Sequence, residues 1–222
     1  MSVVPGRGEP EQIVAKGAFP SATSDGKTIV FASTEPGARA GLWRADADGR
    51  NARQLVPGRV SAPVVTMDDR QVIFHPQRNA TSIVSIDGGT PTEFLHEFAT
   101  GISLSADGRS MLFGSPSRNE LQLVICDLPD CTTRRTVIAP AGGTQFRWAP
   151  DGRSIAYRDR TRQNLWIQPL DSGPPRQLTH FPADRFINDF AWSRDGKRLA
   201  VARSVVTSDI VLFKGLKQVG TR

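Results

Sequence analysis

The strongest constraint on this chain is an internal repeat that recurs about every 44 residues. Five segments share a short apolar strand, a turn containing an aspartate and a second apolar strand. The turn aspartates are Asp25, Asp68, Asp107, Asp151 and Asp195, at spacings of 43, 39, 44 and 44 residues. Such a fixed period indicates an array of supersecondary units that bury their cores against one another. A chain of 222 residues is long enough for one such array to form a single domain.

Each unit has the same expected internal order. The Asp-Gly-Lys/Arg turn joins two strands, because Asp accepts hydrogen bonds from nearby backbone amides and Gly takes a positive φ. A third strand such as 165–168 follows a polar loop, and a fourth such as 176–178 follows a second turn. Asp69 stands at the Gly position of the second unit, which predicts a strained turn there. With no sustained helical periodicity, the sequence predicts an all-β fold: a β-propeller of about five four-stranded antiparallel blades.

The predicted domain is one propeller covering residues 1–222. The fifth unit ends after its predicted third strand, 209–212, and so lacks a fourth strand. Residues 11–14 resemble the fourth strands of other units, so we expect them to pair with 210–212 and close the ring. Closure removes the exposed edge strands of an open stack. The predicted blades are 17–56, 57–95, 96–138, 139–179 and 180–213.

Two turns carry most of a known repeat consensus, Trp-Ser-Pro-Asp-Gly-Lys. They are 148–153 (Trp-Ala-Pro-Asp-Gly-Arg) and 192–197 (Trp-Ser-Arg-Asp-Gly-Lys). These repeats resemble those of TolB-like (WD40-like) β-propellers over essentially the whole chain. The last unit, 190–212, is similar to the final blade of C-terminal propellers in bacterial serine/threonine kinases and winged-helix regulators. Because TolB-like rings usually have six blades, we expect a fragment or a short version of a longer propeller protein.

The resemblance implies a non-catalytic interaction or sensing domain that is commonly periplasmic or otherwise extracytoplasmic. The N-terminal residues, however, lack the apolar run of a secretory signal peptide. No run of 18 apolar residues is present, so we expect no membrane insertion by this chain. The residues alone leave the compartment open.

The chain has two cysteines, Cys126 and Cys131, on either side of a turn that contains Pro129. Two thiols alone do not complete a zinc site. Across a hairpin turn the two sulfurs can face each other, so they are candidates for a local disulfide in an oxidising compartment. The alternatives are two idle thiols, or a redox or metal role for them.

The sequence contains little recognisable catalytic chemistry. Ser24-x-x-Lys27 formally matches a penicillin-recognising motif but occupies the repeated hairpin turn. The histidines are solitary, no nucleophile-elbow or zinc-protease motif is present, and we expect no metal and no cofactor. Asp184 and Asp189, beside Arg185 in the long connection 180–189, are the candidate carboxylate pair of a glycosidase-like alternative. The sequence therefore favours a protein that is not an enzyme.

Positive charge gathers in one set of loops. In a propeller, the loops between second and third strands share a face with the connections between blades. The arginines predicted on this face are Arg39, Arg78, Arg118, Arg158, Arg160, Arg162 and Arg203. Only Glu35, Glu120 and Asp159 oppose them, so the rim attracts anions. An Arg-rich composition, with 23 Arg and 5 Lys, offers the plainer explanation that polar loops simply contain Arg.

These loops contain no aromatic residue, which argues against single-stranded nucleic acid as the partner. An acidic protein segment or an anionic envelope component fits better. The predicted function is a monomeric, non-catalytic protein-binding or sensory module of the bacterial cell envelope. The alternatives are a glycosidase-like propeller enzyme, or the propeller of a prolyl-peptidase-like hydrolase or kinase without its catalytic domain.

Overall fold

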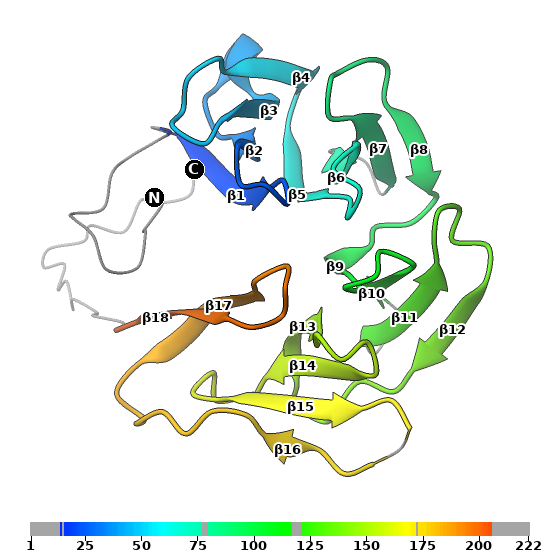
Figure 1. Cartoon of the computed structure of the whole chain (residues 1–222), viewed down its shortest axis with the longest axis vertical. Coiled ribbons are helices and arrows are strands. Elements are labelled where there is room, and N and C mark those ends of the chain that lie inside the picture. The colour runs from blue at the N-terminus through cyan, green and yellow to red at the C-terminus, as the bar shows by residue number, and fades with distance from the viewer. Residues whose placement is uncertain (1–13, 15, 77–79, 117–120, 172, 206–222) are drawn as a thin grey trace, which may run out of the picture.

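The computed structural model describes residues 14, 16–76, 80–116, 121–171 and 173–205. Five antiparallel sheets surround a central opening in chain order (Figure 1). The first four sheets have four strands each, and the fifth has two. In every sheet the first strand lies innermost, so β1, β5, β9, β13 and β17 surround the opening.

The strand bounds follow the repeat. Blade 1 contains β1 (Gly17–Ala22), β2 (Thr28–Ser33), β3 (Gly41–Asp46) and β4 (Arg53–Pro57), with the short 3-10 helix η1 (Gly37–Arg39) between β2 and β3. Blade 2 contains β5 (Val60–Val65), β6 (Gln71–Pro76), β7 (Thr81–Ser85) and β8 (Thr92–Leu95). Blade 3 contains β9 (Thr100–Leu104), β10 (Ser110–Pro116), β11 (Leu121–Asp127) and β12 (Arg134–Val137). Blade 4 contains β13 (Thr144–Trp148), β14 (Ser154–Arg158), β15 (Leu165–Pro169) and β16 (Arg176–Gln177). The fifth sheet contains β17 (Phe186–Trp192) and β18 (Leu199–Ser204).

The structure confirms an all-β propeller with antiparallel four-stranded blades. It shows four such blades rather than the five expected. The difference lies in the fifth unit, whose described residues form two strands. The predicted third strand, 209–212, falls outside the described residues, as does the predicted closing strand 11–14 apart from Val14. Among the described residues no helix is long and apolar enough to cross a membrane.

Apolar cores lie between successive sheets because strand residues alternate between the two faces of a blade. Phe74 in β6 belongs to the cluster shared by blades 1 and 2, whereas its neighbour Ile73 belongs to the cluster shared by blades 2 and 3. Leu112 and Phe113 in β10 divide in the same way between the clusters on the two sides of blade 3. A fourth and smaller cluster joins blade 4 to the fifth sheet through residues that include Phe190.

The turn aspartates explain the repeated Asp-Gly-Lys/Arg sequence. In all five inner turns the carboxylate accepts a hydrogen bond from the backbone N–H two residues later. In blade 3 the hydroxyl of Ser105 also donates to Asp107, at 2.6 Å. This hydroxyl, and then the backbone N–H of Arg109, lower the pKa of the Asp107 carboxyl. The hydrogen bonds of this turn therefore favour the ionised form of Asp107.

The inner turns also pack against one another around the opening. In two places the residue before an Asp contacts the Gly of the next turn: a Cβ on Gly108 would lie 2.8 Å from the Cβ of Met67, and one on Gly196 would lie 2.5 Å from the Cβ of Pro150. In the second turn Asp69 replaces Gly, with φ of 61°. There the backbone N–H of Ser24 donates to both Asp69 oxygens, at 2.9 and 3.0 Å, so a polar contact replaces close packing.

Chain direction defines two faces of the ring. Every first strand runs toward its Asp-containing turn, so the turns between first and second strands and between third and fourth strands share the turn face. The loops between second and third strands and the connections between blades share the connection face. Of the arginines predicted for the binding rim, those in the described residues belong by topology to the connection face: Arg39, Arg158, Arg160, Arg162 and Arg203.

Candidate functional site

The two faces differ in the apolar surface that they expose. Five large hydrophobic side chains are exposed among the described residues: Phe19 (57%), Phe98 (37%), Ile138 (96%), Phe186 (37%) and Val205 (61%). By topology all five lie on the connection face or in the half of a strand next to it. Exposed apolar side chains that gather on one face are typical of a binding surface.

Each of these residues has a local reason for its position. Phe98 and Ile138 lie in connections between blades, Phe186 begins β17, and Val205 follows β18. Phe19 lies at a β-bulge in β1, with φ of 54°, where the register with β2 shifts. The bulge changes the direction of the Phe19 side chain relative to a regular strand. Equivalent bulge residues with positive φ occur in β5, β9 and β13, so the bulge belongs to the repeat.

Arg158 is partly buried where blade 4 meets the fifth sheet. Its Nη1 donates to the backbone oxygens of Ile187 at 2.8 Å and Asn188 at 3.2 Å, and its Nε donates to Thr144 Oγ1 at 3.2 Å. Burial, and then the charge of nearby Arg162, lower the pKa of Arg158. This arginine therefore fastens the fifth sheet to blade 4.

Arg162 and Arg160 lie in the same loop and are both exposed. Arg162 Nη2 donates to Asn188 Oδ1 at 3.1 Å, and its guanidinium lies 5.7 Å from the ring centroid of Phe186. Phe186 thus presents an apolar ring beside a cation at the edge of the connection face. Such Arg–aromatic pairs are frequent at protein interfaces.

Arg203 is engaged within its own sheet and the connection before it. Its guanidinium lies 4.4 Å from the ring centroid of Phe181 and donates to the backbone oxygen of Pro182 at 2.8 Å. It also pairs with Asp184 at 3.0 Å, and its side chain is 18% exposed. Arg203 therefore contributes more to the structure of the fifth sheet than to a free positive surface.

The remaining predicted arginines are separate from this junction. Arg39 ends η1 on blade 1, is exposed, and pairs with Glu35 at 3.3 Å. Arg78 and Arg118 fall outside the described residues. The structure therefore brings Arg158, Arg162 and Arg203 to the segment 181–188, while Arg39 lies on a different blade.

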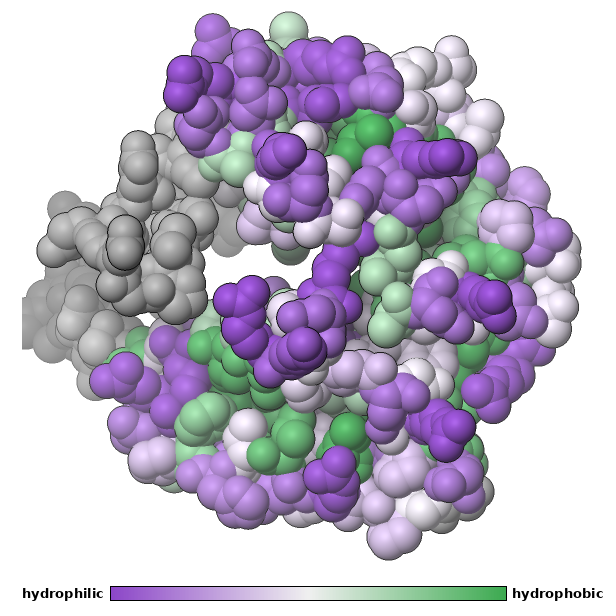
Figure 2. Space-filling model, viewed as in Figure 1, coloured by the Kyte–Doolittle hydropathy of each residue, from purple (hydrophilic) through white to green (hydrophobic). Residues whose placement is uncertain are grey.

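The turn face is polar by comparison. Its exposed charges form pairs within turns, such as Arg50 with Asp48 at 2.7 Å and Lys27 with Asp25 at 3.9 Å. Figure 2 shows hydrophilic residues extending across the centre of the ring. The apolar and cationic residues of the connection face thus contrast with a turn face whose charges are locally balanced.

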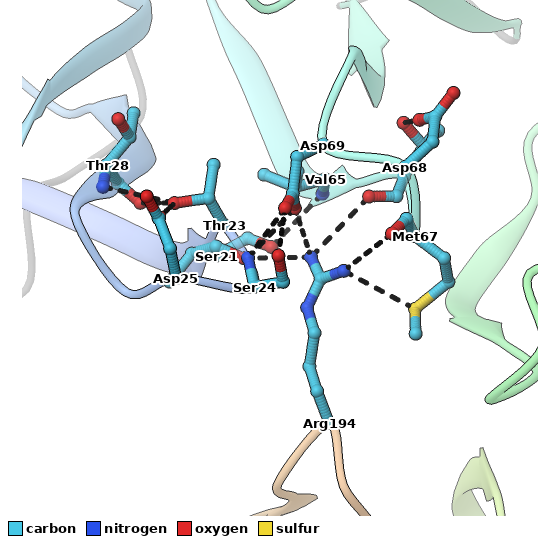
Figure 3. A network of polar contacts seen from close by, with 12 residues as sticks. Ser21, Thr23, Ser24, Asp25, Thr28, Val65, Met67, Asp68, Asp69 and Arg194 are labelled. Atoms are coloured by element: carbon cyan, nitrogen blue, oxygen red, sulfur yellow. Dashed lines mark hydrogen bonds and ion pairs between the residues drawn. The ribbon is translucent and has the colours of Figure 1, made fainter.

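At the ring centre, the turn between β17 and β18 reaches blades 1 and 2 through Arg194 (Figure 3). Arg194 Nη2 lies 3.0 Å from Asp69 Oδ1 and donates to the backbone oxygen of Ala22 at 3.1 Å, while Nη1 donates to the backbone oxygen of Met67 at 3.2 Å. Ser24 donates to the same Asp69 through its hydroxyl. We call Ser24, Asp69 and Arg194 the central clasp.

The two cysteines are joined in the structure. Cys126 at the end of β11 and Cys131 after the turn form a disulfide with a Cα–Cα distance of 4.9 Å. Both belong to the buried cluster between blades 2 and 3. The disulfide therefore closes the turn before β12 and contributes to the interface between these blades.

The titratable groups outside the arginine-rich loops are mostly structural. His75 in β6 is buried, contacts Thr81 Oγ1 through Nδ1 at 3.3 Å, and lies 4.6 Å from the ring of Phe98. Burial lowers the pKa of His75. The described residues contain no group of three or more His, Cys, Asp or Glu side chains placed to hold a metal ion.

Sequence reasoning missed the exposed hydrophobic residues and the central clasp. A signal was present for both. Phe98 and Ile138 are apolar residues between predicted strands, where polar residues are the norm. Asp69 replaces the Gly of the other four turns, and Arg194 is the one charged residue among those that precede the turn aspartates. The structure brings these two residues together.

Comparisons with known proteins agree on the fold. The chain is similar to a protein assigned as TolB from Agrobacterium tumefaciens, with 16% identity, a TM-score of 0.59, and coverage of 83% of this chain and 79% of that one. It is similar to TolB from Acinetobacter baumannii, with 17% identity, a TM-score of 0.64, and coverage of 88% and 57%. It is also similar to an oligogalacturonate lyase in complex with manganese, with 14% identity, a TM-score of 0.63, and coverage of 87% and 60%.

No protein-family profile matches the sequence. The chain spans less than two thirds of the length of the Acinetobacter TolB and of the lyase. At sequence identities this low, the structural similarity establishes a shared fold and nothing more specific. The protein is therefore a propeller module with a TolB-like fold.

Proposed function

We propose that this propeller is a non-catalytic module that binds a protein partner through its connection face. The observation that carries the proposal is the coincidence, on that face, of the exposed hydrophobic residues with exposed Arg39, Arg160 and Arg162. Apolar anchors that share a face with exposed arginines suit a partner segment in which acidic residues alternate with apolar ones. By resemblance to the TolB-like family, the compartment is extracytoplasmic and the partner belongs to the cell envelope.

A selection of displayed random peptides on the intact chain tests this proposal. We expect the enriched peptides to carry acidic residues beside aromatic or aliphatic ones. Ile138→Asp should weaken their binding about tenfold, since it places a charge on an exposed apolar anchor. Pro174→Asp, at an exposed position in the β15–β16 turn on the turn face, is the matched control and should leave binding unchanged. Equal binding to both variants would exclude the connection face.

The enzyme alternative is a glycosidase-like propeller, or the propeller of a hydrolase or kinase. One of its solved structural neighbours is a lyase. The candidate carboxylates are already paired: Asp184 with Arg203 at 3.0 Å, and Asp189 with Arg147 at 3.5 Å. Turnover of a glycoside or oligogalacturonate that disappears in Asp184→Asn or Asp189→Asn would replace the binding proposal with an enzymatic one.

We also propose that residues 11–14 complete the fifth blade, so that the chain forms a closed, monomeric, five-bladed ring. The proposal rests on the fifth sheet, which has two strands among the described residues and so leaves room for the predicted third strand 209–212 and for residues 11–14 beside it. Deleting residues 1–14 should lower the unfolding midpoint and promote association between chains. A deletion variant that keeps both the midpoint and the monomeric state would contradict closure by this segment.

A further inference from the structure

The ring centre contains a small cavity that is independent of the connection face. Its volume is about 140 Å³, and it opens between the inner turns of blades 3 and 4 and the β17–β18 turn. Four units supply its walls: Met67 comes from blade 2, Ser103 and Ala106 from blade 3, Trp148 and Pro150 from blade 4, and Trp192 from the fifth sheet. The cavity therefore exists because the β17–β18 turn folds over the centre of the ring.

The charge of the lining is one-sided. Arg147 and Arg194 line the cavity, and no carboxylate is among its lining residues. Arg194 is committed to the central clasp and supplies mainly a positive potential. Within the part of the chain that the structure describes, Arg147 makes two long contacts, 3.4 Å to the backbone oxygen of Phe146 and 3.5 Å to Asp189, so most of its donor capacity is unused in these contacts. An anion that enters the cavity can therefore accept hydrogen bonds from the Arg147 guanidinium.

Three further polar groups of the lining have a hydrogen-bond donor to offer. Trp148 and Trp192 both line the cavity, and within the described structure each indole N–H is buried without a hydrogen-bond partner. Buried donors without a partner are rare in native proteins because each costs the lost hydrogen bond to water. The Ser103 hydroxyl accepts from the backbone N–H of Trp148, which leaves its own proton available. The cavity thus offers donors and needs acceptors.

Size and apolar surface limit the ligand further. Leu104, Ala106, Pro150 and Met67 supply apolar walls beside these donors. A cavity of about 150 Å³ holds a molecule of the size of benzene. From this combination we propose that the central cavity binds a small monocarboxylate with a short aliphatic body, whose carboxylate faces Arg147.

Butyrate is the probe, with butyramide and butylamine as uncharged and cationic molecules of similar size. Because two of the four tryptophans line the cavity, tryptophan fluorescence and the unfolding midpoint both report binding. We expect butyrate to change the fluorescence and raise the midpoint, and the other two compounds to do neither. An equal response to butyramide, or no response to butyrate, would overturn the proposal.

Two variants locate the response. Arg147→Met should weaken butyrate binding at least tenfold, whereas Arg153→Met, on an exposed turn residue outside the lining, should not. If Arg147→Met fails to fold, Ala106→Leu provides a second test, because it fills the cavity without changing its charge. Binding that survives Ala106→Leu would place the carboxylate elsewhere and overturn the proposal. Neither result affects peptide binding at Ile138, so this test and that of the proposed function fail separately.

Discussion

The complete blades and the fifth sheet are held in the ring by different kinds of contact. Among the described residues, nine buried side chains form the cluster between blades 1 and 2, and four form the cluster between blade 4 and the fifth sheet. In β6 four consecutive residues are buried, so both faces of that strand are covered, whereas no residue of β18, the equivalent second strand of the fifth sheet, is buried. Arginines supplement this smaller core: Arg158 from blade 4, and Arg194 toward blades 1 and 2.

This difference shows how a repeat unit with little apolar burial can be positioned. Apolar burial contributes stability without much directional preference, at about 25 cal/mol per Å². Hydrogen bonds from guanidinium groups to fixed carbonyl oxygens require one geometry. The fifth sheet should therefore respond more strongly than the complete blades to changes in the inner turns.

The largest expected effect on stability comes from adding a side chain at Gly196, where the fifth inner turn packs against Pro150. A Cβ at Gly196 would overlap Pro150, and its φ is +69°. Gly196→Ala should lower the free energy of unfolding by about 2–4 kcal/mol, the sum of overpacking and an unfavourable φ. Gly152→Ala, with φ of +62° and nothing within 4 Å, carries only the φ cost and should lose about 1 kcal/mol. Equal losses in urea unfolding would refute the packing of turn upon turn.

The disulfide gives the complete blades a covalent constraint that the described fifth sheet lacks. Replacing both Cys126 and Cys131 with Ala should lower stability by about 2 kcal/mol, from the entropy of the short loop that the bond closes. Hydrogen exchange should show the loss in blade 3. Mass spectrometry of the unreduced wild-type chain provides the check: a chain with both thiols free would contradict the bond.

Removing the central clasp should have a smaller effect that is localised. Arg194→Met should cost about 1–2 kcal/mol, because a partly exposed ion pair and its hydrogen bonds are lost. Asp69→Gly restores the repeat residue at φ of 61° and allows a double-mutant cycle with Arg194→Met. We expect a coupling energy of about 1 kcal/mol that decreases with added salt. Additive effects of the two changes would show that the clasp does not hold the fifth sheet.

The smallest expected effect is a pH dependence located in a complete blade. Burial lowers the pKa of His75 below its unfolded value of 6.5, so its contribution to stability is present above that pH and declines as the pH falls below it. His75→Phe should flatten the decline in the unfolding midpoint between about pH 7 and 5. His96→Gln, at an exposed side chain, is the control. An unchanged slope in His75→Phe would assign the acid sensitivity to other groups.

The propeller class was predictable because the repeat, the turn chemistry and the alternation of apolar residues all depend on neighbours in sequence. The role of the arginines was not. Arg158 and Arg203 are directed at backbone oxygens of Ile187 and Pro182, and such acceptors become apparent only when two segments fold together. A pattern of polar loops therefore predicts where arginines lie along the chain but not whether their charges remain free.

The same reasoning applies to the ring centre. The departure at Asp69 predicted a strained turn, and its φ of 61° agrees. Its partners, Ser24 and Arg194, come from the first and fifth units, so their convergence depends on the circular order of the sheets. Comparison of the five turns with one another singles out Asp69 and Arg194 as unusual residues. The structure explains them, because the two side chains form an ion pair.

The most direct test of the connection face as the docking surface is the affinity of a selected acidic peptide for two charge-reversed variants. Arg160→Glu changes an exposed arginine on the connection face, and Arg109→Glu changes an exposed arginine on the turn face. The account predicts a dissociation constant raised about tenfold by the first change and nearly unaltered by the second. Similar affinities of the two variants would contradict it.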